Sequence, residues 1–236
     1  MSPRRGPDLP YSVVAGVTPA RMKWLVASAK MAGSNFAPEP PKLYDTFMEV
    51  LDERPSFAAI VLNAPVGYRD SPGSPPRTCD LQARALLSHR GKFVHNAPTR
   101  EALRRGVSSP DDHMDAVTAM LLPSYVEVAN EMSPYRQRVV YEGNPELSFY
   151  ILNGEVPLRR SKKIMDGRDE RRVILEKKIP GISKVLDAEI PGVAPRHLLD
   201  ASALLWSARR VLSRGAKRLP LDGEWDSEGL RMEFVY

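Results

Sequence analysis

The stretch Phe-Ala-Ala-Ile-Val-Leu-Asn-Ala-Pro-Val-Gly at residues 57–67 decides the fold that we predict for this chain. Residues 58–62 form an uninterrupted apolar run, which is typical of a central strand covered by helices on both faces. The run ends at Asn63, and a Pro/Gly turn follows. Because ligands of open α/β sheets bind beyond the carboxyl ends of the strands, Asn63 is a candidate site residue. The alternative is that its side chain only caps the strand.

Composition limits what this strand can belong to. With 236 residues, of which 42% are hydrophobic and 27% charged, the chain can bury one sizeable core. We expect a disordered tail over residues 1–10. A single α/β domain should follow over residues 11–236, with a helical insertion at about residues 91–135.

Several classes of protein are disfavoured. The lone Cys79 excludes an internal disulfide, and we expect it to be a small buried residue. The four histidines lack the spacing of metal ligands, which argues against structural zinc. No run reaches the roughly 18 apolar residues that span a bilayer, and the first residues lack the apolar segment of a signal peptide. We therefore predict a cytoplasmic protein with no membrane partner.

The other elements are predicted from hydrophobic periodicity and turn residues. Strands are expected at residues 11–17, 23–30, 34–36, 138–142 and 231–236, the first two antiparallel. Helices are expected at residues 43–52, 77–90, 99–105, 112–130, 147–152, 168–178 and 197–214. Pro123 should break or kink the fourth of these helices. The Pro, Gly and Ser-rich loop at residues 68–76 is long enough to be a lid or a site loop.

Polar residues follow three of the predicted strands, at Thr18, Asn63 and Glu142. Asp200 precedes Leu204 by four residues, which places a carboxylate on the apolar face of the last helix. That charge needs a partner unless Asp200 caps the helix start. The layout resembles a ribonuclease H-like fold, in which carboxylates lie at the ends of the first and central strands and on the C-terminal helix. Two Mg²⁺ ions held there would activate a water and stabilise the leaving oxygen of a phosphodiester.

Positive charge is concentrated in two runs. The net formal charge is +5, and residues 159–178 carry nine Lys/Arg against four Asp/Glu, while residues 209–218 carry five basic residues and no acid. Such runs are typical of solvated helix faces, and they also suit a phosphate-bearing ligand. Arg77, Asp80 and Arg84 share one face of their predicted helix, where they can stiffen the surface or offer arginine forks to phosphate oxygens.

Five separated motifs carry a resemblance to a known family. They are Leu-Asn-Ala-Pro-Val-Gly at residues 62–67, Arg-Thr-Cys-Asp-Leu-Gln-Ala-Arg at 77–84, Tyr-Glu-Gly-Asn-Pro-Glu-Leu-Ser-Phe at 141–149, Ser-Lys-Lys at 161–163 with Gly-Arg at 167–168, and Asp-Ala-Ser-Ala at 200–203. In this order they resemble domain of unknown function 429 (DUF429), described as predicted RNase H-like nucleases. The resemblance spans about residues 13–236. It implies a mixed central sheet, with three antiparallel strands and parallel later strands, flanked by helices on both faces.

The sequence departs from the family pattern at three positions. Thr18 replaces the Asp of a Gly-Val-Asp motif, Asn63 replaces the Asp of Asp-x-Pro, and Asn144 replaces the His of Glu-x-His-Pro-Glu. The acidic residues Glu142, Glu146 and Asp200 are retained. Neutral oxygens can coordinate a hard cation but do not supply the charge that attracts Mg²⁺ out of its hydration shell. A two-metal site should therefore be weakened.

Two functions of different classes follow from the resemblance. The first is a metal-dependent nuclease or phosphodiester hydrolase that uses Mg²⁺ or Mn²⁺ and no organic cofactor. Glu142 and Asp200 would hold one ion, with help from Glu146, while Thr18 and Asn63 bind through oxygen or water. The substrate-binding set would be Arg77, Asp80, Arg84, Asn144, Lys162, Lys163 and Arg168. The second is a catalytically inactive relative that binds nucleic acid or a nucleotide, and a third option is a scaffold or oligomerisation module.

Overall fold

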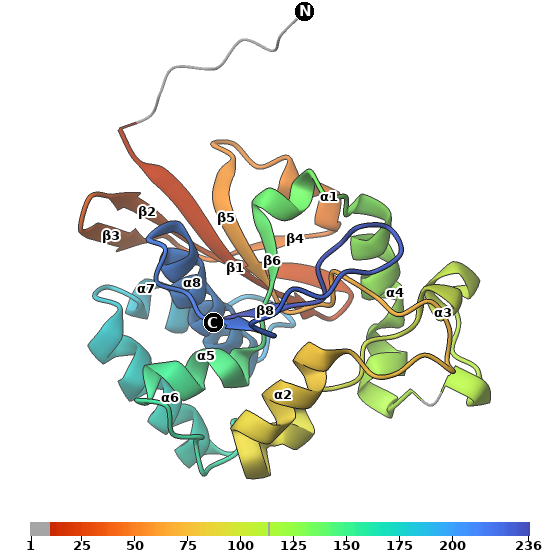
Figure 1. The fold of residues 1–236 in the computed structure, drawn as a ribbon. Helices are drawn as coiled ribbons and strands as arrows, with labels where there is room; N and C mark the ends of the chain where they lie inside the picture. Colours follow the sequence, from red (N-terminus) through yellow and green to blue (C-terminus); the bar gives the residue numbers. More distant parts are fainter. Residues whose placement is uncertain (1–9, 113) are drawn as a thin grey trace, which may run out of the picture.

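A mixed β-sheet lies at the centre of the computed structural model, which describes residues 10–112 and 114–236 (Figure 1). Apart from Pro10, the predicted tail lies outside the described residues. The strand order is β3-β2-β1-β5-β6. β1 (Ser12–Ala20), β2 (Lys23–Ala32) and β3 (Asn35–Pro38) are antiparallel, whereas β5 (Phe57–Leu62) and β6 (Val140–Glu142) run parallel to β1. Three antiparallel strands beside parallel later strands confirm the expected ribonuclease H-like class of fold.

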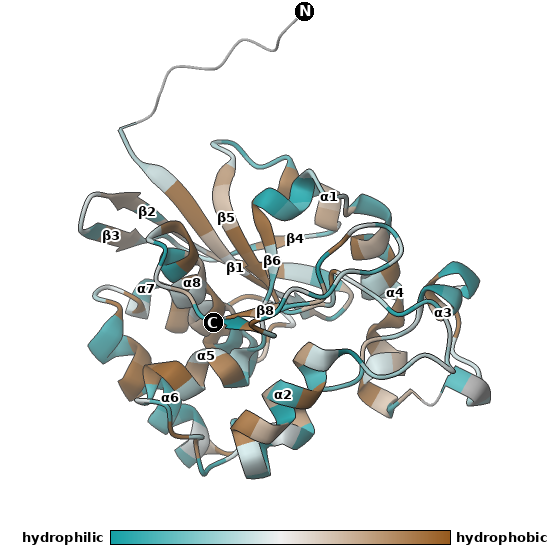
Figure 2. Ribbon diagram, in the orientation of Figure 1, coloured by the Kyte–Doolittle hydropathy of each residue, from teal (hydrophilic) through white to brown (hydrophobic). Residues whose placement is uncertain are grey.

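Helices cover both faces of the sheet (Figure 1). On one face, α8 (Pro195–Leu212) crosses β1 and β5, and α5 (Pro145–Leu152), α6 (Met165–Lys178) and α7 (Ser183–Leu186) pack around α8. The other face is covered by α1 (Phe47–Leu51) and α4 (Ala116–Glu131). The strands between these layers are the most apolar part of the ribbon (Figure 2). We find no described helix with the length and apolarity of a membrane span.

Shorter elements lie around this framework. They are β4 (Lys42–Tyr44), α2 (Thr78–Leu87), α3 (Arg100–Arg105), the 3-10 helices η1 (Ser88–Phe93), η2 (Pro110–Asp112) and η3 (Arg136–Arg138), and the hairpin of β7 (Arg218–Leu219) with β8 (Phe234–Val235). α2 packs on α5 and β7, and together they bury a third apolar cluster that includes Cys79. The prediction that Cys79 is buried is confirmed.

Gly16 determines how closely α8 approaches the sheet. A Cβ added at Gly16 would lie 2.1 Å from the carbonyl oxygen of Ala201 and 2.2 Å from the amide nitrogen of Leu205. The backbone of α8 therefore rests directly on β1. Because side chains alternate along a strand, Thr18 faces α8 as Gly16 does, whereas Val17 faces the cluster formed with α4.

β1 is longer than the sequence suggested. The strand was expected to end at Thr18-Pro19, yet it continues to Ala20 and pairs with β2 throughout. Pro19 is tolerated because the neighbouring β5 has already ended: the last bond on that side runs from the Asn63 N–H to the Val17 carbonyl, 2.8 Å. Thr18 therefore lies inside a strand.

Other predicted boundaries also need correction. The helix expected at residues 43–52 is split into β4 and the short α1, because Thr46 caps a helix that begins only at Phe47. The helix expected from residue 112 begins at Ala116, after the Asp115 cap, and continues through Pro123 without a break. The final strand is confined to β8, which pairs with the unpredicted β7.

Candidate functional site

Thr18 and Asn63 meet at the carboxyl ends of the central strands. The Asn63 side-chain amide donates a 2.9 Å hydrogen bond to the Thr18 hydroxyl. Thr18 is buried and faces α8, and Asn63 directly follows β5. The family pattern has a carboxylate at each of these positions, and here a neutral hydrogen bond joins them.

Glu142 lies beside these residues in the sheet but points to the opposite face. In the parallel ladder it is paired with Leu62, which is paired with Val17, and both partners belong to the cluster on the α4 side. Paired residues of neighbouring strands project to the same face, so Glu142 faces α4 as well. The structure therefore separates Glu142 from Asp200 on α8. Glu142 and Asp200 were expected to hold one ion together, and this geometry does not match that expectation. Successive side chains along a strand point to opposite faces of the sheet, and Glu142 points to the face that α8 does not cover.

Arg77 occupies both oxygens of Glu142. Its Nη1 and Nη2 atoms lie 2.9 Å and 2.7 Å from the two carboxylate oxygens, and the Val66 N–H donates a further 2.9 Å bond. The same guanidinium binds both oxygens of Asp80, at 3.0 Å and 2.7 Å, and the Gly67 carbonyl at 2.9 Å. Burial raises the pKa of the Glu142 carboxyl, and Arg77 opposes that rise. Arg77 is thus an internal counterion rather than a ligand-facing group.

Glu146 is held by two arginines from different elements. Arg90 of η1 donates at 3.1 Å and 2.9 Å, and Arg171 of α6, which is completely buried, donates at 3.3 Å and 3.2 Å. Although burial alone would raise the pKa of Glu146, Lys162 and the two arginines hold it below its usual value. Asn144 caps α5 by accepting a 2.9 Å bond from the Glu146 N–H. Both residues therefore have structural partners.

Asp200 finds its counterion in Lys162. The ammonium lies 2.7 Å from each carboxylate oxygen, and the Asp200 side chain is only 7% exposed. Burial raises the pKa of Asp200, and Lys162 opposes that rise. The prediction that a carboxylate on this face needs a partner holds, and the helix instead begins at Pro195 with Ala194 as its cap residue. Lys162 was expected to contact the phosphate of a substrate, whereas in the structure its ammonium is the counterion of Asp200.

The remaining predicted substrate residues are dispersed. Arg84 does not bridge to Asp80: its Nε donates to the Val94 carbonyl at 2.9 Å, and its Nη2 contacts Asn96. Lys163 is exposed, and Arg168 donates a 3.1 Å bond to the Lys163 carbonyl. Lys163 directly follows Lys162 in the chain, and Arg168 lies on α6.

The residues present do not fit a divalent metal centre. Each carboxylate that the family pattern assigns to metal binding is already paired with a guanidinium or an ammonium. Thr18 and Asn63 bind each other and carry no charge. Within the described part of the chain, no three His, Cys, Asp or Glu side chains are grouped so that they could hold an ion. Hard cations need several oxygen ligands with free lone pairs, and this arrangement offers few.

A basic group at the start of α8 was missed by sequence reasoning. His197 has its pKa lowered to about 4 by burial and by the nearby cations Arg196, Lys162 and Arg21. Its Nδ1 atom is buried without a hydrogen-bond partner in the described structure. Arg21 comes from the β1–β2 turn and lies against Gly192, where an added Cβ would be 3.3 Å from its Nη1. The signal in the sequence that could have identified Arg21 as a site residue is its position immediately after β1.

Comparison with known proteins gives the following. Two solved structures of RuvC from Thermus thermophilus resemble the chain: one has 17% identity and a TM-score of 0.35, covering 87% of this chain and 98% of that chain. The other, RuvC in complex with a Holliday junction substrate, has 14% identity and a TM-score of 0.38 with the same coverage. No curated protein matches the chain. The sequence model of the family described as protein of unknown function (DUF429) matches residues 16–224. The chain therefore belongs to the DUF429 family, as its motifs indicated.

Proposed function

We propose that this domain binds the phosphate backbone of nucleic acid at the carboxyl end of β1 and does not hydrolyse it. One observation carries the proposal: each buried acidic residue of the site is paired with a basic side chain, while further surface cations form no salt bridge with any described residue. Glu142, Glu146 and Asp200 are each in contact with Arg or Lys side chains. The site therefore lacks the uncompensated negative charge that a metal-dependent nuclease requires.

The buried centre is close to electrically neutral. Its four carboxylates, Asp80, Glu142, Glu146 and Asp200, face four basic side chains, Arg77, Arg90, Lys162 and Arg171. Adding a divalent cation would require breaking one of these pairs. Breaking a buried pair costs about 3–5 kcal/mol, which would have to be recovered from ligation by two neutral residues.

Surface cations around this centre are not compensated. Arg21, Arg196, Lys163 and Arg168 form no salt bridge within residues 10–112 and 114–236. Arg21 comes from the β1–β2 turn, Arg196 from the first turn of α8, Lys163 from the segment before α6, and Arg168 from α6 itself. Because Arg21, Arg196 and Lys163 are exposed and arise from three segments, the group suits an extended polyanion at the surface.

The turn that carries Arg21 is held in an unusual conformation. Arg21 and Met22 both have positive φ angles, 52° and 61°, in a two-residue turn without glycine. Gly, Asn or Asp normally occupy these positions because other side chains are strained there. The turn therefore presents the Arg21 side chain at the surface, beside a methionine that is 55% exposed.

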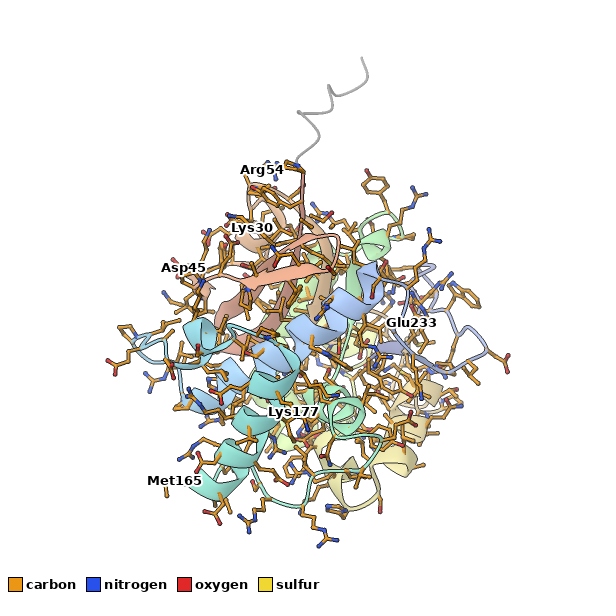
Figure 3. The ribbon with its side chains drawn as sticks, turned by 90° about the vertical axis from the view of Figure 1, so that its left-hand side faces the viewer. Lys30, Asp45, Arg54, Met165, Lys177 and Glu233 are labelled. Atoms are coloured by element: carbon orange, nitrogen blue, oxygen red, sulfur yellow. The ribbon has the colours of Figure 1, made fainter. Side chains whose placement is uncertain are left out.

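Binding is tested by fluorescence anisotropy with labelled single-stranded and double-stranded oligonucleotides over a series of salt concentrations. We expect log K to fall linearly with log salt, and R21Q/R196Q to reduce the magnitude of the slope by about 0.7–0.9 for each lost phosphate contact. The matched control is R54Q: Arg54 is exposed but precedes β5 (Figure 3), at the opposite end of that strand from Asn63.

Cleavage assays with Mg²⁺ and Mn²⁺ complete the test. The proposal predicts intact oligonucleotide in both ions, with binding unchanged by D200N/K162M, a variant that removes a paired charge from each side. Metal-dependent cleavage that D200N abolishes would establish the nuclease instead. If no oligonucleotide binds at low salt, the proposal is wrong.

A further inference from the structure

A shallow, open basic cavity lies between α2, η1 and the start of α4. It has a volume of about 400 Å³. Its lining residues are Arg84, Lys92, Val94, His95, Asn96, Asp115, Ala116 and Val117. The proposed function uses none of them. The volume falls within the range of small-molecule sites, which begins at roughly 300 Å³.

The walls of this cavity are fixed by hydrogen bonds between distant segments. Arg84 ties α2 to the 94–96 segment through the Val94 carbonyl and the Asn96 side chain. The Thr118 hydroxyl joins α4 to the same segment by donating a 2.9 Å bond to the Asn96 carbonyl. Asp115 caps α4 by accepting from the N–H groups of Val117 and Thr118 at 2.9 Å and 3.0 Å. A preorganised cavity of this kind loses little entropy when a ligand binds.

His95 is oriented by Asp115. Its Nδ1–H donates to the second Asp115 oxygen at 3.1 Å, so the opposite ring nitrogen, Nε2, points away from that carboxylate. The pKa of Asp115 is lowered, since its hydrogen bonds to Thr118 and His95 and the charge of His95 outweigh burial. In its imidazolium form a histidine carries an N–H donor on each ring nitrogen. In that form His95 would keep its bond to Asp115 through Nδ1 and donate from Nε2 to an anionic oxygen.

Positive charge exceeds negative charge around the cavity. Arg84 and Lys92 are permanent cations there, and Asp115 is the one carboxylate among the lining residues. Arg84 uses its Nε and Nη2 atoms for the wall, and no bond of its Nη1 is seen within residues 10–112 and 114–236. The Lys92 ammonium lies 5.5 Å from the centre of the Phe93 ring and forms no salt bridge with a described residue. A guanidinium, an ammonium and an imidazole line the same cavity, and this set of donors suits a phosphate dianion.

We propose that this cavity binds a phosphate monoester. Arg84 and Lys92 would contact its oxygens, His95 Nε2 would donate to a third oxygen, and Val94 and Val117 would pack on the attached organic group. The ligand is either a small molecule, such as a nucleoside monophosphate, or the 5′-phosphate end of a nucleic acid. Both share the terminal phosphate, which an internal phosphodiester lacks.

The experiment follows histidine ring resonances by NMR while inorganic phosphate, adenosine 5′-monophosphate, and 5′-phosphorylated or 5′-hydroxyl oligonucleotide are added. H95N, which keeps an amide donor for Asp115, assigns the His95 signals. The proposal predicts saturable chemical-shift changes of His95 with inorganic phosphate and with adenosine 5′-monophosphate. It predicts no equal chemical-shift change of His197, which lies at the start of α8 near the carboxyl end of β1. If the 5′-phosphorylated oligonucleotide moves His95 and the 5′-hydroxyl form does not, the natural source includes nucleic-acid ends.

Variants distinguish phosphate binding in this cavity from nucleic-acid binding at the carboxyl end of β1. K92Q should weaken phosphate binding about tenfold, as expected for losing one charge-assisted hydrogen bond. K177Q is the matched control, because Lys177 is exposed on α6 (Figure 3). R21Q/R196Q should leave phosphate binding unchanged. No saturable shift of His95 with either phosphate, or equal weakening by K92Q and K177Q, would overturn the proposal whether or not oligonucleotides bind at the carboxyl end of β1.

Discussion

Replacing Arg77 with methionine gives the sharpest test of the internal counterions. Arg77, Asp80 and Glu142 are each only about 3% exposed at the side chain, and the guanidinium makes four contacts of 2.7–3.0 Å with the two carboxylates. R77M leaves both carboxylates buried, and Glu142 keeps the Val66 N–H. Breaking a buried pair costs about 3–5 kcal/mol, which sets the lower bound of the expected loss.

Proton uptake sets the upper bound. A carboxyl with an ordinary pKa near 4 can be neutralised at pH 7 for about 4 kcal/mol, so two of them limit the loss to about 8 kcal/mol. In R77M the folded state binds more protons than the unfolded state, so its stability should fall as pH rises from 5 to 7, by about 1.4 kcal/mol per pH unit for each proton taken up. A loss of this size approaches the whole stability of an ordinary domain.

The assay is urea unfolding at pH 5, 6 and 7, followed by circular dichroism. R77M/D80N/E142Q, which removes the charge from all three side chains, should recover much of the loss and its pH dependence. R160M is the matched control, because Arg160 pairs with Asp166 at 2.9 Å with both side chains more than half exposed, and it should cost at most about 1 kcal/mol. If R77M unfolds within 1 kcal/mol of the parent at pH 7, or with no dependence on pH, the reasoning about these counterions is wrong.

Three further predictions concern the carboxyl end of β1 and its packing. T18D/N63D replaces a 2.9 Å neutral hydrogen bond with two adjacent carboxylates, which repel each other. The melting temperature of this variant in EDTA should therefore fall below that of the parent, and Mn²⁺ should raise it again. The melting temperature of the control T18S/N63Q should not respond to Mn²⁺. Oligonucleotide affinity should rise as pH falls from about 7 to 5. The pKa of His197 is about 4 in the free protein, and a bound polyanion would raise it by offsetting the charges of Arg196, Lys162 and Arg21. H197Q should flatten this pH profile, and an unchanged profile in H197Q would contradict the placement of the ligand. G16A should destabilise the fold by more than about 3 kcal/mol in urea unfolding, because the added Cβ would lie 2.1 Å from the Ala201 carbonyl oxygen, whereas G73A, with no atom within 4 Å of the added Cβ, should be nearly neutral; equal effects would refute the close packing of α8.

The class of fold was predictable because its signals are local. The apolar run of β5 required cover on both faces, and the short connection between the first two strands required an antiparallel pair. Thr18 and Asn63 were expected in one site, and the structure brings them into contact near the carboxyl ends of neighbouring strands. Pro123 was expected to break or kink its helix, and the structure shows no break, because α4 continues through it.

The partners of the acidic residues were not predictable. Asp200 was recognised as a buried carboxylate in need of a cation, but nothing in the sequence showed that Lys162, 38 residues away, provides it. Arg90 and Arg171, which hold Glu146, lie on η1 and α6 and share no motif. The face to which Glu142 points depends on the register of β6, and a single-residue step decides it.

The most direct test of the central claim measures oligonucleotide binding in EDTA and again with Mg²⁺ at matched ionic strength. If internal cations have taken the place of metal ions and surface cations hold the backbone, affinity is the same in both conditions and falls steeply with added salt. Binding that appears only when Mg²⁺ is present, or that is accompanied by cleavage, would contradict the account.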